Sequence, residues 1–184
     1  MSASELDLFD LSSPDKLHIG GECRIHGWKV LNIADGAHVD FCCDLRDLSQ
    51  FADASFDVIY ASHVLEHFGY QRELPVVMRG IHRILRSHGR FMISVPDLEA
   101  LAKLLLAESD PIERVKIMRY MFGGQLHMND FHLTGFTVEI LAFFLHRAGF
   151  RDYFRVQEFN ITRDTSQKAH KGTPMSLNVI AVKS

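Results

Sequence analysis

The sequence has 184 residues, of which 47% are hydrophobic and 23% are charged, and its formal net charge is −3. A chain of this length forms one domain and buries about 70% of its unfolded surface, so it needs no disulfide staple. The weak negative charge argues against nucleic-acid binding, and no apolar run approaches the roughly 18 residues of a membrane span. Three cysteines make a poor disulfide framework, and we expect a cytoplasmic protein.

The acidic start of the chain is typical of neither a signal peptide nor a transit peptide. We expect residues 1–15 to form a loosely ordered leader and residues 16–184 to form a single domain. Five short apolar runs then have the length and the β-branched or aromatic content of strands: Leu17–Gly21, Lys29–Ala34, Val39–Cys43, Phe56–Ser62 and Arg90–Val95. Their near-continuous hydrophobicity predicts a parallel sheet that is covered on both faces.

Helical spacing from Leu74 to Leu85 predicts a helix that ends at Gly89. Asp97, Asp110 (followed by proline) and Thr137 are typical N-cap residues in front of three further helices. The last two runs, Tyr153–Phe159 and Leu177–Val182, have no helix between them and predict paired strands around a polar loop at 163–174. This alternation predicts an α/β domain whose ligands bind at the carboxyl ends of the strands.

Small and polar residues follow the first three predicted strands. Glycine lets a ligand approach the backbone closely, and a carboxylate after the second strand can bind both hydroxyls of a ribose. Simple turns at Gly20-Gly21 and Asp35-Gly36 are the alternative interpretation. The candidate residues in chain order are Gly20, Gly21, Asn32, Ala34, Asp35, Asp44 and Leu45.

The densest group of titratable residues follows the fourth strand, in Ser62, His63, Glu66 and His67. His63, Glu66 and His67 form the H-x-x-E-H pattern of inverted zincins, which binds zinc only on a well-formed helix. A strand leads straight into the pattern, so we favour acid–base chemistry and assign no metal. His63 is the preferred general base because an ordinary histidine titrates near 6.5, and local capping by Glu66 and His67 is the alternative.

A second polar cluster, residues 125–132, follows Gly123 and Gly124 and is typical of a mobile lid. We expect a lid over about residues 107–136, where the choice of substrate resides and from which His132 reaches the site. A metal site at His127, Asp130 and His132 matches no strong spacing template.

Taken together, these segments resemble class I S-adenosylmethionine-dependent methyltransferases over residues 16–183. LHIGGE stands at the family's glycine-rich first motif, and FDVIYASHVLEHF resembles its fourth-strand motif. IHRILRSHGRFMISVPD, GFTVEILAFFLHRAGF and SLNVIAVK resemble later parts of the domain. The likeness extends to a poorly characterised bacterial branch of predicted methyltransferases with LHIGG, SHVLEH and FGGQ segments.

The resemblance implies a Rossmann-like, doubly wound, mostly parallel seven-stranded sheet of order 3-2-1-4-5-7-6, with strand 7 antiparallel. It also implies a site for S-adenosylmethionine, which leaves as S-adenosylhomocysteine. Gly20 and Gly21 would pass under the methionine part, and His18 stands where the family usually has an acid. Asn32, Ala34 and Asp35 would face the ribose, and Asp44 and Leu45 the adenine. Ser62 and His63 would lie beside the sulfonium and the acceptor. Apart from the resemblance, we expect Glu66 or His67 to orient His63 and His132 to reach in from the lid.

Four departures from the family pattern motivate an alternative. They are His18, Glu22 at a usual glycine, the ribose carboxylate one place late at Asp35, and a first crossover of about seven residues (ECRIHGW), too short for a full helix. We predict a methyltransferase acting on a small or mid-sized acceptor, without nucleic-acid or membrane partners. The alternative is a catalytically inactive member of the fold that serves as a binding module. The sequence specifies neither the acceptor nor the oligomeric state.

Overall fold

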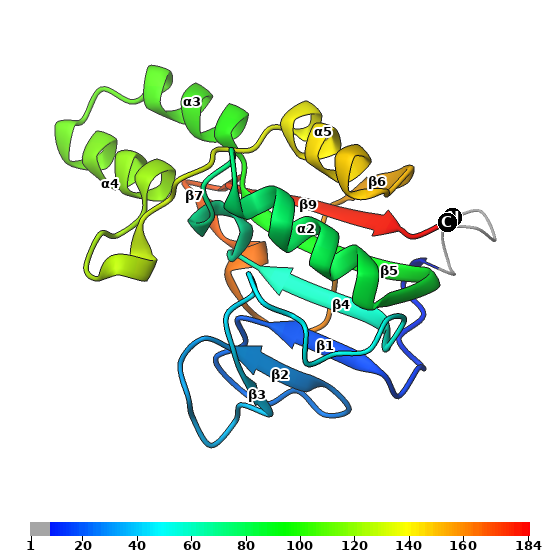
Figure 1. Cartoon of the computed structure of the whole chain (residues 1–184). Helices are drawn as coiled ribbons and strands as arrows, with labels where there is room; N and C mark the ends of the chain where they lie inside the picture. Colours follow the sequence, from blue (N-terminus) through cyan, green and yellow to red (C-terminus); the bar gives the residue numbers. More distant parts are fainter. Residues whose placement is uncertain (1–7) are drawn as a thin grey trace.

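A computed structural model describes residues 8–184. Its centre is a seven-stranded sheet of order β3-β2-β1-β4-β5-β9-β6 (Figure 1). The strands are β1 (Lys16–Ile19), β2 (Lys29–Asn32), β3 (Phe41–Cys42), β4 (Phe56–Ser62), β5 (Leu85–Pro96), β6 (Asp152–Val156) and β9 (Ser176–Val182). β9 runs antiparallel to both β5 and β6, and the other pairs are parallel. The predicted order and the antiparallel last strand are therefore confirmed, with β9 as the seventh strand.

Helices α2 (Glu73–Ile84) and α5 (Val138–Ala148) cover one face of the sheet (Figure 1). The apolar stripe of α2 is fully buried there, and Thr137 caps α5 as predicted. α2 ends at Ile84 and not at Gly89, because β5 begins at the next residue. Gly89 lies inside β5, where a Cβ would stand 2.8 Å from the carbonyl oxygen of Arg86. The requirement for glycine there comes from a close approach of backbone and not from a helix end.

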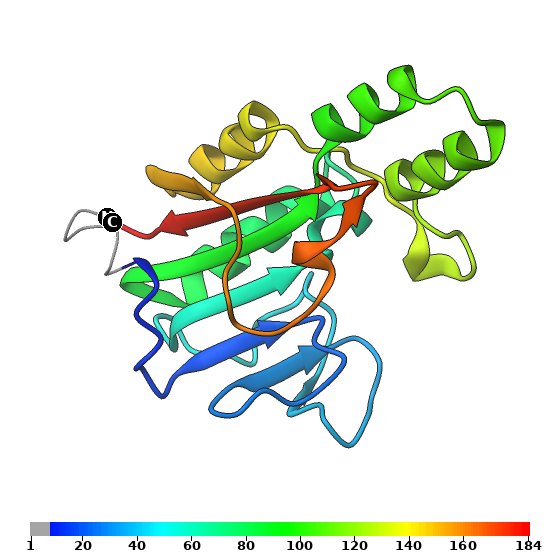
Figure 2. The ribbon, with the colours of Figure 1, turned by 180° about the vertical axis from the view of Figure 1, so that it is seen from behind.

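Loops cover much of the opposite face, which Figure 2 shows crossed by the segment between β6 and β7. No helix joins β1 to β2, so the predicted loss of the first crossover helix is confirmed. A second hydrophobic cluster fills this face with Trp28, Val58, Tyr60, Met92, Phe159 and Ile180. Leu8, Phe9 and Leu11 pack against the cluster, so this part of the predicted leader is attached to the sheet. Residues 1–7 of that leader lie outside the described residues.

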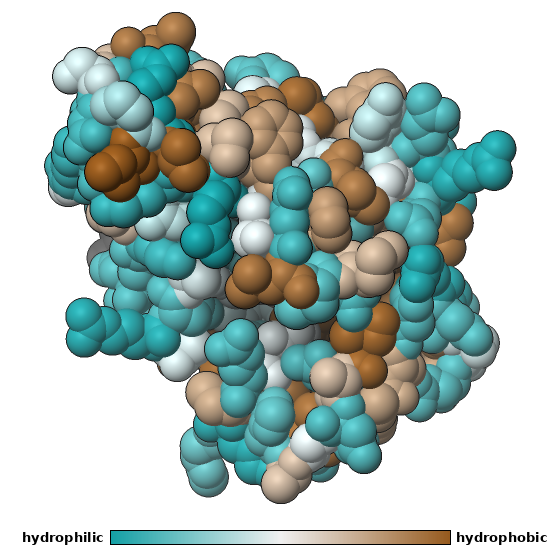
Figure 3. Space-filling model, turned by 90° about the vertical axis from the view of Figure 1, so that its left-hand side faces the viewer, coloured by the Kyte–Doolittle hydropathy of each residue, from teal (hydrophilic) through white to brown (hydrophobic). Residues whose placement is uncertain are grey.

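Helices α3 (Leu98–Ala107) and α4 (Pro111–Phe122) project beyond the carboxyl edge of the sheet (Figure 1). Asp97 and Asp110 cap them, as predicted, by accepting hydrogen bonds from backbone N–H groups of their first turns. α4 exposes several apolar side chains among its charged residues, and Figure 3 shows hydrophobic side chains interspersed with hydrophilic ones in the upper part of this side of the molecule. The exposed apolar residues of α4 are Ile112, Val115, Met118 and Phe122. None of the helices in residues 8–184 is long and apolar enough to cross a membrane.

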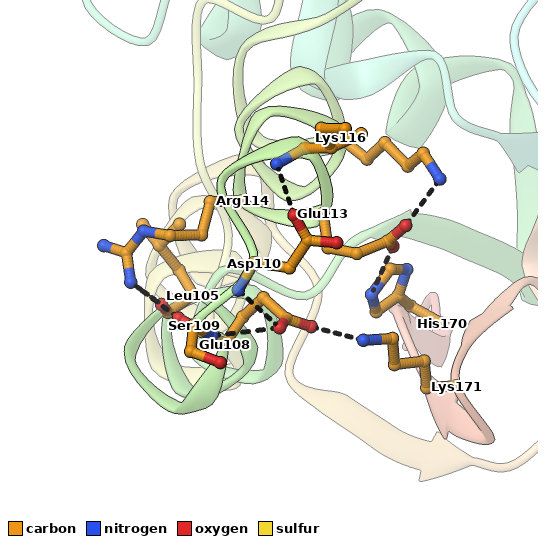
Figure 4. Close-up of polar contacts among 10 residues, drawn as sticks. Leu105, Glu108, Ser109, Asp110, Glu113, Arg114, Lys116, His170 and Lys171 are labelled. Atoms are coloured by element: carbon orange, nitrogen blue, oxygen red, sulfur yellow. Dashed lines mark hydrogen bonds and ion pairs between the residues drawn. The ribbon is translucent and has the colours of Figure 1, made fainter.

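The corner between α3 and α4 is fastened to a small hairpin formed by β7 (Ala169–His170) and β8 (Thr173–Pro174). Lys171 Nζ lies 2.6 Å from a carboxylate oxygen of Glu108, and His170 Nε2 lies 3.5 Å from one of Glu113 (Figure 4). Glu108 also accepts backbone hydrogen bonds from Ser109 and Asp110. The segment predicted as a plain loop thus contains a hairpin that holds the α3–α4 corner in place.

Candidate functional site

A cavity of about 470 Å³ opens at the carboxyl ends of β4 and β5, between α4 and the loop that leads into β9. Its walls come from four parts of the chain: the segment after β4, the end of β5, the lid, and the segment that leads into and begins β9. Those residues are His63, Glu66, His67, Pro96, Lys116, Arg119, Tyr120, Gly123, Gly124, Asp130, His132, Thr165, Lys168, Met175 and Ser176. The four predicted catalytic residues, His63, Glu66, His67 and His132, are therefore brought together around one cavity.

His63 stands directly after β4 with a φ of +55°, in the left-handed region. Its backbone N–H donates to the carbonyl of Ser94, and its Nε2 lies 2.9 Å from Ser176 Oγ. Ser176 donates its only hydroxyl proton to the carbonyl of Thr165, so Nε2 of His63 carries the hydrogen of their contact. The lone pair of a neutral His63 is then on Nδ1, which lies 3.3 Å from Glu66 Oε1.

Glu66 is the most buried polar group of the site, with a fully inaccessible side chain. Neither carboxylate oxygen has a hydrogen-bond partner among residues 8–184, although Oε1 lies 3.3 Å from His63 Nδ1 and 4.0 Å from His132 Nε2. The backbone carbonyl of Glu66 accepts hydrogen bonds from Leu133 and Thr134, which return from the lid. A buried carboxylate without a hydrogen-bond donor is costly, so this position fits a positively charged group.

The rings of His67 and His132 meet edge to face beside the same carboxylate, with ring centroids 5.1 Å apart. His67 Nδ1 lies 3.0 Å from the carbonyl oxygen of Phe131 and must donate to it, because a carbonyl only accepts. Burial lowers the pKa of His132 below its ordinary value, while the negative charge of Glu66 opposes that shift.

The helix that an H-x-x-E-H zinc site requires is not formed. Residues 65–67 make only the short 3₁₀ turn η1 (Leu65–His67), so His63 and His67 do not share a helix face. The three lid residues that we considered as a metal site, His127, Asp130 and His132, do not come together either. His127 is exposed, and the carboxylate of Asp130 accepts hydrogen bonds from the backbone N–H groups of Gly124 and Leu126.

The glycine turn after β1 has the form expected of a ligand-binding turn. Gly20 has a φ of +73°, and a Cβ on it would stand 2.5 Å from Val64 Cγ2. A Cβ on Gly21 would stand 2.6 Å from His18 Nδ1, a buried nitrogen without a hydrogen-bond partner. His18 stacks on Tyr60, and burial lowers its pKa, so the imidazole is neutral. An unpartnered buried nitrogen beside a glycine turn fits a polar ligand group at this place.

The residues after β2 and β3 that we predicted to bind a ligand differ in whether their side chains are already hydrogen-bonded within the protein. Asn32 uses its amide locally, donating to the carbonyl of Gly21 and accepting from the N–H of Ala34. Asp35 is exposed, and its carboxylate accepts only the local N–H of Gly36. Asp44 is paired with Arg46, whose hydrogen bonds lower the pKa of that carboxyl, and Leu45 is buried. Asp35 is therefore the available acid at this edge.

Sequence reasoning missed the wall of the cavity that is formed by Thr165, Lys168 and Ser176. Ser62 Oγ lies 3.1 Å from Thr165 Oγ1, so this wall also contacts the end of β4. The signal was available, because an antiparallel last strand begins where its parallel neighbours end. The first residue of β9 must therefore lie at the ligand-binding edge.

Comparison with protein families finds one match, a methyltransferase domain, over residues 28–93. This match begins after the glycine turn and ends within β5. A solved S-adenosylmethionine-dependent methyltransferase from Archaeoglobus fulgidus superposes with a TM-score of 0.60 at 17% identity, covering 98% of this chain and 90% of that one. The chain has the fold of the class I methyltransferases. The resemblance seen in the sequence is confirmed at this level, and the bacterial branch stays a prediction.

Two further structures share the methyltransferase fold. A 1,6-didemethyltoxoflavin-N1-methyltransferase from Burkholderia thailandensis, solved with S-adenosylhomocysteine, has a TM-score of 0.55 at 20% identity and covers 98% of this chain and 74% of its own. An exported-protein candidate from Bordetella parapertussis has a TM-score of 0.55 at 13% identity over 92% of this chain. This chain spans only 62% of that protein's length. No curated protein matches this chain.

Proposed function

We propose that this protein transfers a methyl group from S-adenosylmethionine to an acceptor bound in the cavity beside His63. The observation that carries the proposal is the convergence of three features in one fold. A methyltransferase-domain match spans β2 to β5, a glycine turn follows β1, and a cavity lined by titratable groups lies at the carboxyl end of β4. The B. thailandensis relative, which is a methyltransferase solved with S-adenosylhomocysteine, supports the choice of cofactor.

S-adenosylmethionine would supply the electrophilic methyl group on its sulfonium. In this proposal the turn at Gly20 and Gly21 receives the methionine part, with the free Nδ1 of His18 as a polar partner. Asp35 binds the ribose hydroxyls, since it is the exposed acid at the end of β2. Asn32 and Ala34 shape the ribose edge, while Leu45 and Asp44 border the adenine. Ser62 and His63 stand between the cofactor and the acceptor.

His63 is the proposed proton acceptor. Its Nε2 hydrogen is committed to Ser176, so Nδ1 carries the lone pair of the neutral ring. Glu66 Oε1, 3.3 Å away, would stabilise the imidazolium that forms once the acceptor's proton is taken. The alignment of the acceptor with the methyl group supplies the rest of the rate enhancement, because holding reactants in line lowers the barrier by about 7–11 kcal/mol.

Basic side chains line part of the cavity and favour an acceptor with a negative group. Lys168 lies over the Tyr120 ring at 5.4 Å, and Arg119 lines the same cavity. Neither side chain takes part in an ion pair with the described residues, whereas Lys116 is paired with Glu113. Arg119 and Lys168 are therefore available to form an ion pair with an anionic acceptor.

Calorimetric titration with S-adenosylhomocysteine and S-adenosylmethionine tests the cofactor site. We expect micromolar binding that Asp35→Asn weakens by about tenfold, as the loss of one charge-assisted hydrogen bond predicts. Asp47→Asn is the matched control, since Asp47 is also exposed near the sheet edge but only bonds its own turn. Absence of binding at millimolar ligand would favour the alternative of an inactive fold that serves as a binding module.

A further inference from the structure

The three side chains of Glu66, His67 and His132 offer one ligand atom each, and these atoms all lie within 4.8 Å of one another. We propose that they bind a divalent transition-metal ion, with zinc as the reference ion, on the wall of the cavity. Among residues 8–184 this is the one group of three or more acidic, histidine or cysteine side chains that converges in this way. The test of this proposal does not require methyl transfer, because it measures ion binding by the free protein.

The donor set matches zinc chemistry. Zinc in catalytic sites is often held by two histidines and one glutamate, with a fourth position left open. Bonds of about 2.1 Å place neighbouring ligand atoms roughly 3.4 Å apart in a tetrahedral site. The measured 4.0 Å between Glu66 Oε1 and His132 Nε2 requires only a small side-chain movement to reach that spacing.

The tautomer of His67 is already the one that a ligand needs. Its Nδ1 donates to the carbonyl of Phe131, which leaves the lone pair of the neutral ring on Nε2. Metal-binding histidines commonly have this arrangement, in which the second ring nitrogen donates to a backbone carbonyl and fixes the ring. Phe131 thus acts as an outer partner from the lid.

The burial of Glu66 is an independent observation that favours a cation at this place. Its carboxylate is fully buried, lines the cavity, and has no hydrogen-bond donor on either oxygen. The nearby nitrogens at 3.3 and 4.0 Å do not meet hydrogen-bond geometry. A divalent ion would compensate this buried charge, whereas a structural role for Glu66 would have produced hydrogen bonds to its carboxylate.

The open fourth position would face the cavity, which also holds His63. A ligand oxygen, nitrogen or sulfur atom could occupy it, and its acidity would increase on binding the ion. The three ligands come from two parts of the chain, η1 and the end of the lid. Ion binding would therefore also fasten the lid to the sheet.

The test uses the full chain, stripped with a chelator and titrated with Zn²⁺ against a chromophoric competitor. Cobalt absorption provides a second readout of coordination. We expect one tight site per chain. His132→Ala and Glu66→Gln should each weaken it by at least about 100-fold, beyond the 10–100-fold loss that removing an outer-shell partner causes. His127→Ala is the matched control, because His127 is an exposed histidine of the same lid and should leave affinity unchanged.

Circular dichroism shows whether each variant folds. Should the buried positions not tolerate substitution, His67→Ala tests the same site at a half-buried ligand whose one described hydrogen bond goes to Phe131. Absence of stoichiometric binding by the wild-type chain would overturn the proposal. So would an equal loss of affinity in the His127→Ala and ligand variants, because binding would then be a property of surface histidines. Neither result depends on methyl transfer.

Discussion

The hydroxyl of Tyr60 in β4 donates a 2.6 Å hydrogen bond to Asp164 Oδ2, 104 residues further along the chain. The bond joins the sheet to the loop at residues 157–168, which covers the face of the sheet opposite α2 and α5 (the helix-poor face). Asp164 also accepts from the N–H of Ser166 and so begins the turn η3 (Thr165–Gln167). The same loop contributes Thr165 and Lys168 to the cavity, so this contact links the back of the sheet to the candidate site.

Replacing Tyr60 by phenylalanine should lower the free energy of unfolding by about 1.5–3 kcal/mol, the usual range for a hydrogen bond to a charged group. Urea denaturation measures the change. Tyr70→Phe is the control, because Tyr70 is 54% exposed and its variant should stay within about 0.5 kcal/mol of the parent. Equal stability of the two variants would show that the hydrogen bond does not hold the loop.

Stability should fall as the pH is lowered through the ordinary histidine range. Burial lowers the pKa values of His18, His82 and His132 in the folded chain below 6.5. The unfolded chain then binds more protons than the folded one below about pH 6.5, so unfolding becomes easier as the pH drops further.

His18→Phe should reduce this pH dependence while keeping the stacking on Tyr60. Denaturation curves between pH 5 and pH 8 (roughly one unit or more on either side of the ordinary value) measure the slope. His88→Phe is the comparison, because His88 is exposed. A slope unchanged in His18→Phe would mean that this imidazole takes up its proton without unfolding.

The link between Glu108 and Lys171 should keep the α3–α4 corner closed against the β7–β8 hairpin. Glu108→Gln should speed proteolytic cleavage within residues 107–136, because the charged partner of Lys171 is lost. Glu99→Gln is the matched control, since Glu99 pairs only with Lys103 inside α3.

The same link has a defined pH range. Hydrogen bonds to Lys171 and to backbone N–H groups lower the pKa of Glu108 to about 2. Its contribution is therefore complete above the ordinary glutamate value near 4.5 and is lost as the pH falls toward 2. Cleavage of the parent chain by an acid-active protease should approach the rate of the Glu108→Gln variant over that interval. Parallel rates throughout would contradict the assignment.

Replacing His63 by alanine should affect turnover and cofactor affinity unequally. A general base contributes about 10²–10⁴ in rate, so turnover with an acceptor found by screening should fall by about 100-fold or more. Affinity for S-adenosylhomocysteine should change little. Ser176→Ala removes the partner of Nε2 and a hydrogen bond to the carbonyl of Thr165 but keeps the imidazole, and it should have a smaller effect. Unchanged turnover in His63→Ala would exclude His63 as the base.

The strands and the grouping of the catalytic candidates could be predicted because both follow from local patterns, whereas the sheet order is implied by the resemblance to the methyltransferase family. Short apolar runs identify parallel strands, and the residues after each strand must meet at one edge. The end of α2 could not be placed correctly. A glycine such as Gly89 is equally typical of a helix end and of a tight backbone contact inside a strand. The contacts of Thr165 with Ser62 and of Ser176 with His63 join residues more than 100 positions apart, so the sequence indicates the edge at which Ser176 lies but not its partner.

The central position of β9 sets an order of events for folding. Residues 176–182 enter the sheet between β5 and β6, and neither neighbour can pair fully before they have been synthesised. The loop over the helix-poor face, at residues 157–168, is also made late. Until then, the apolar side chains of Val58, Tyr60 and Met92 are uncovered on the nascent chain. Folding of this domain therefore cannot finish before β9 has been synthesised, and a chain that stops before β9 is expected to aggregate.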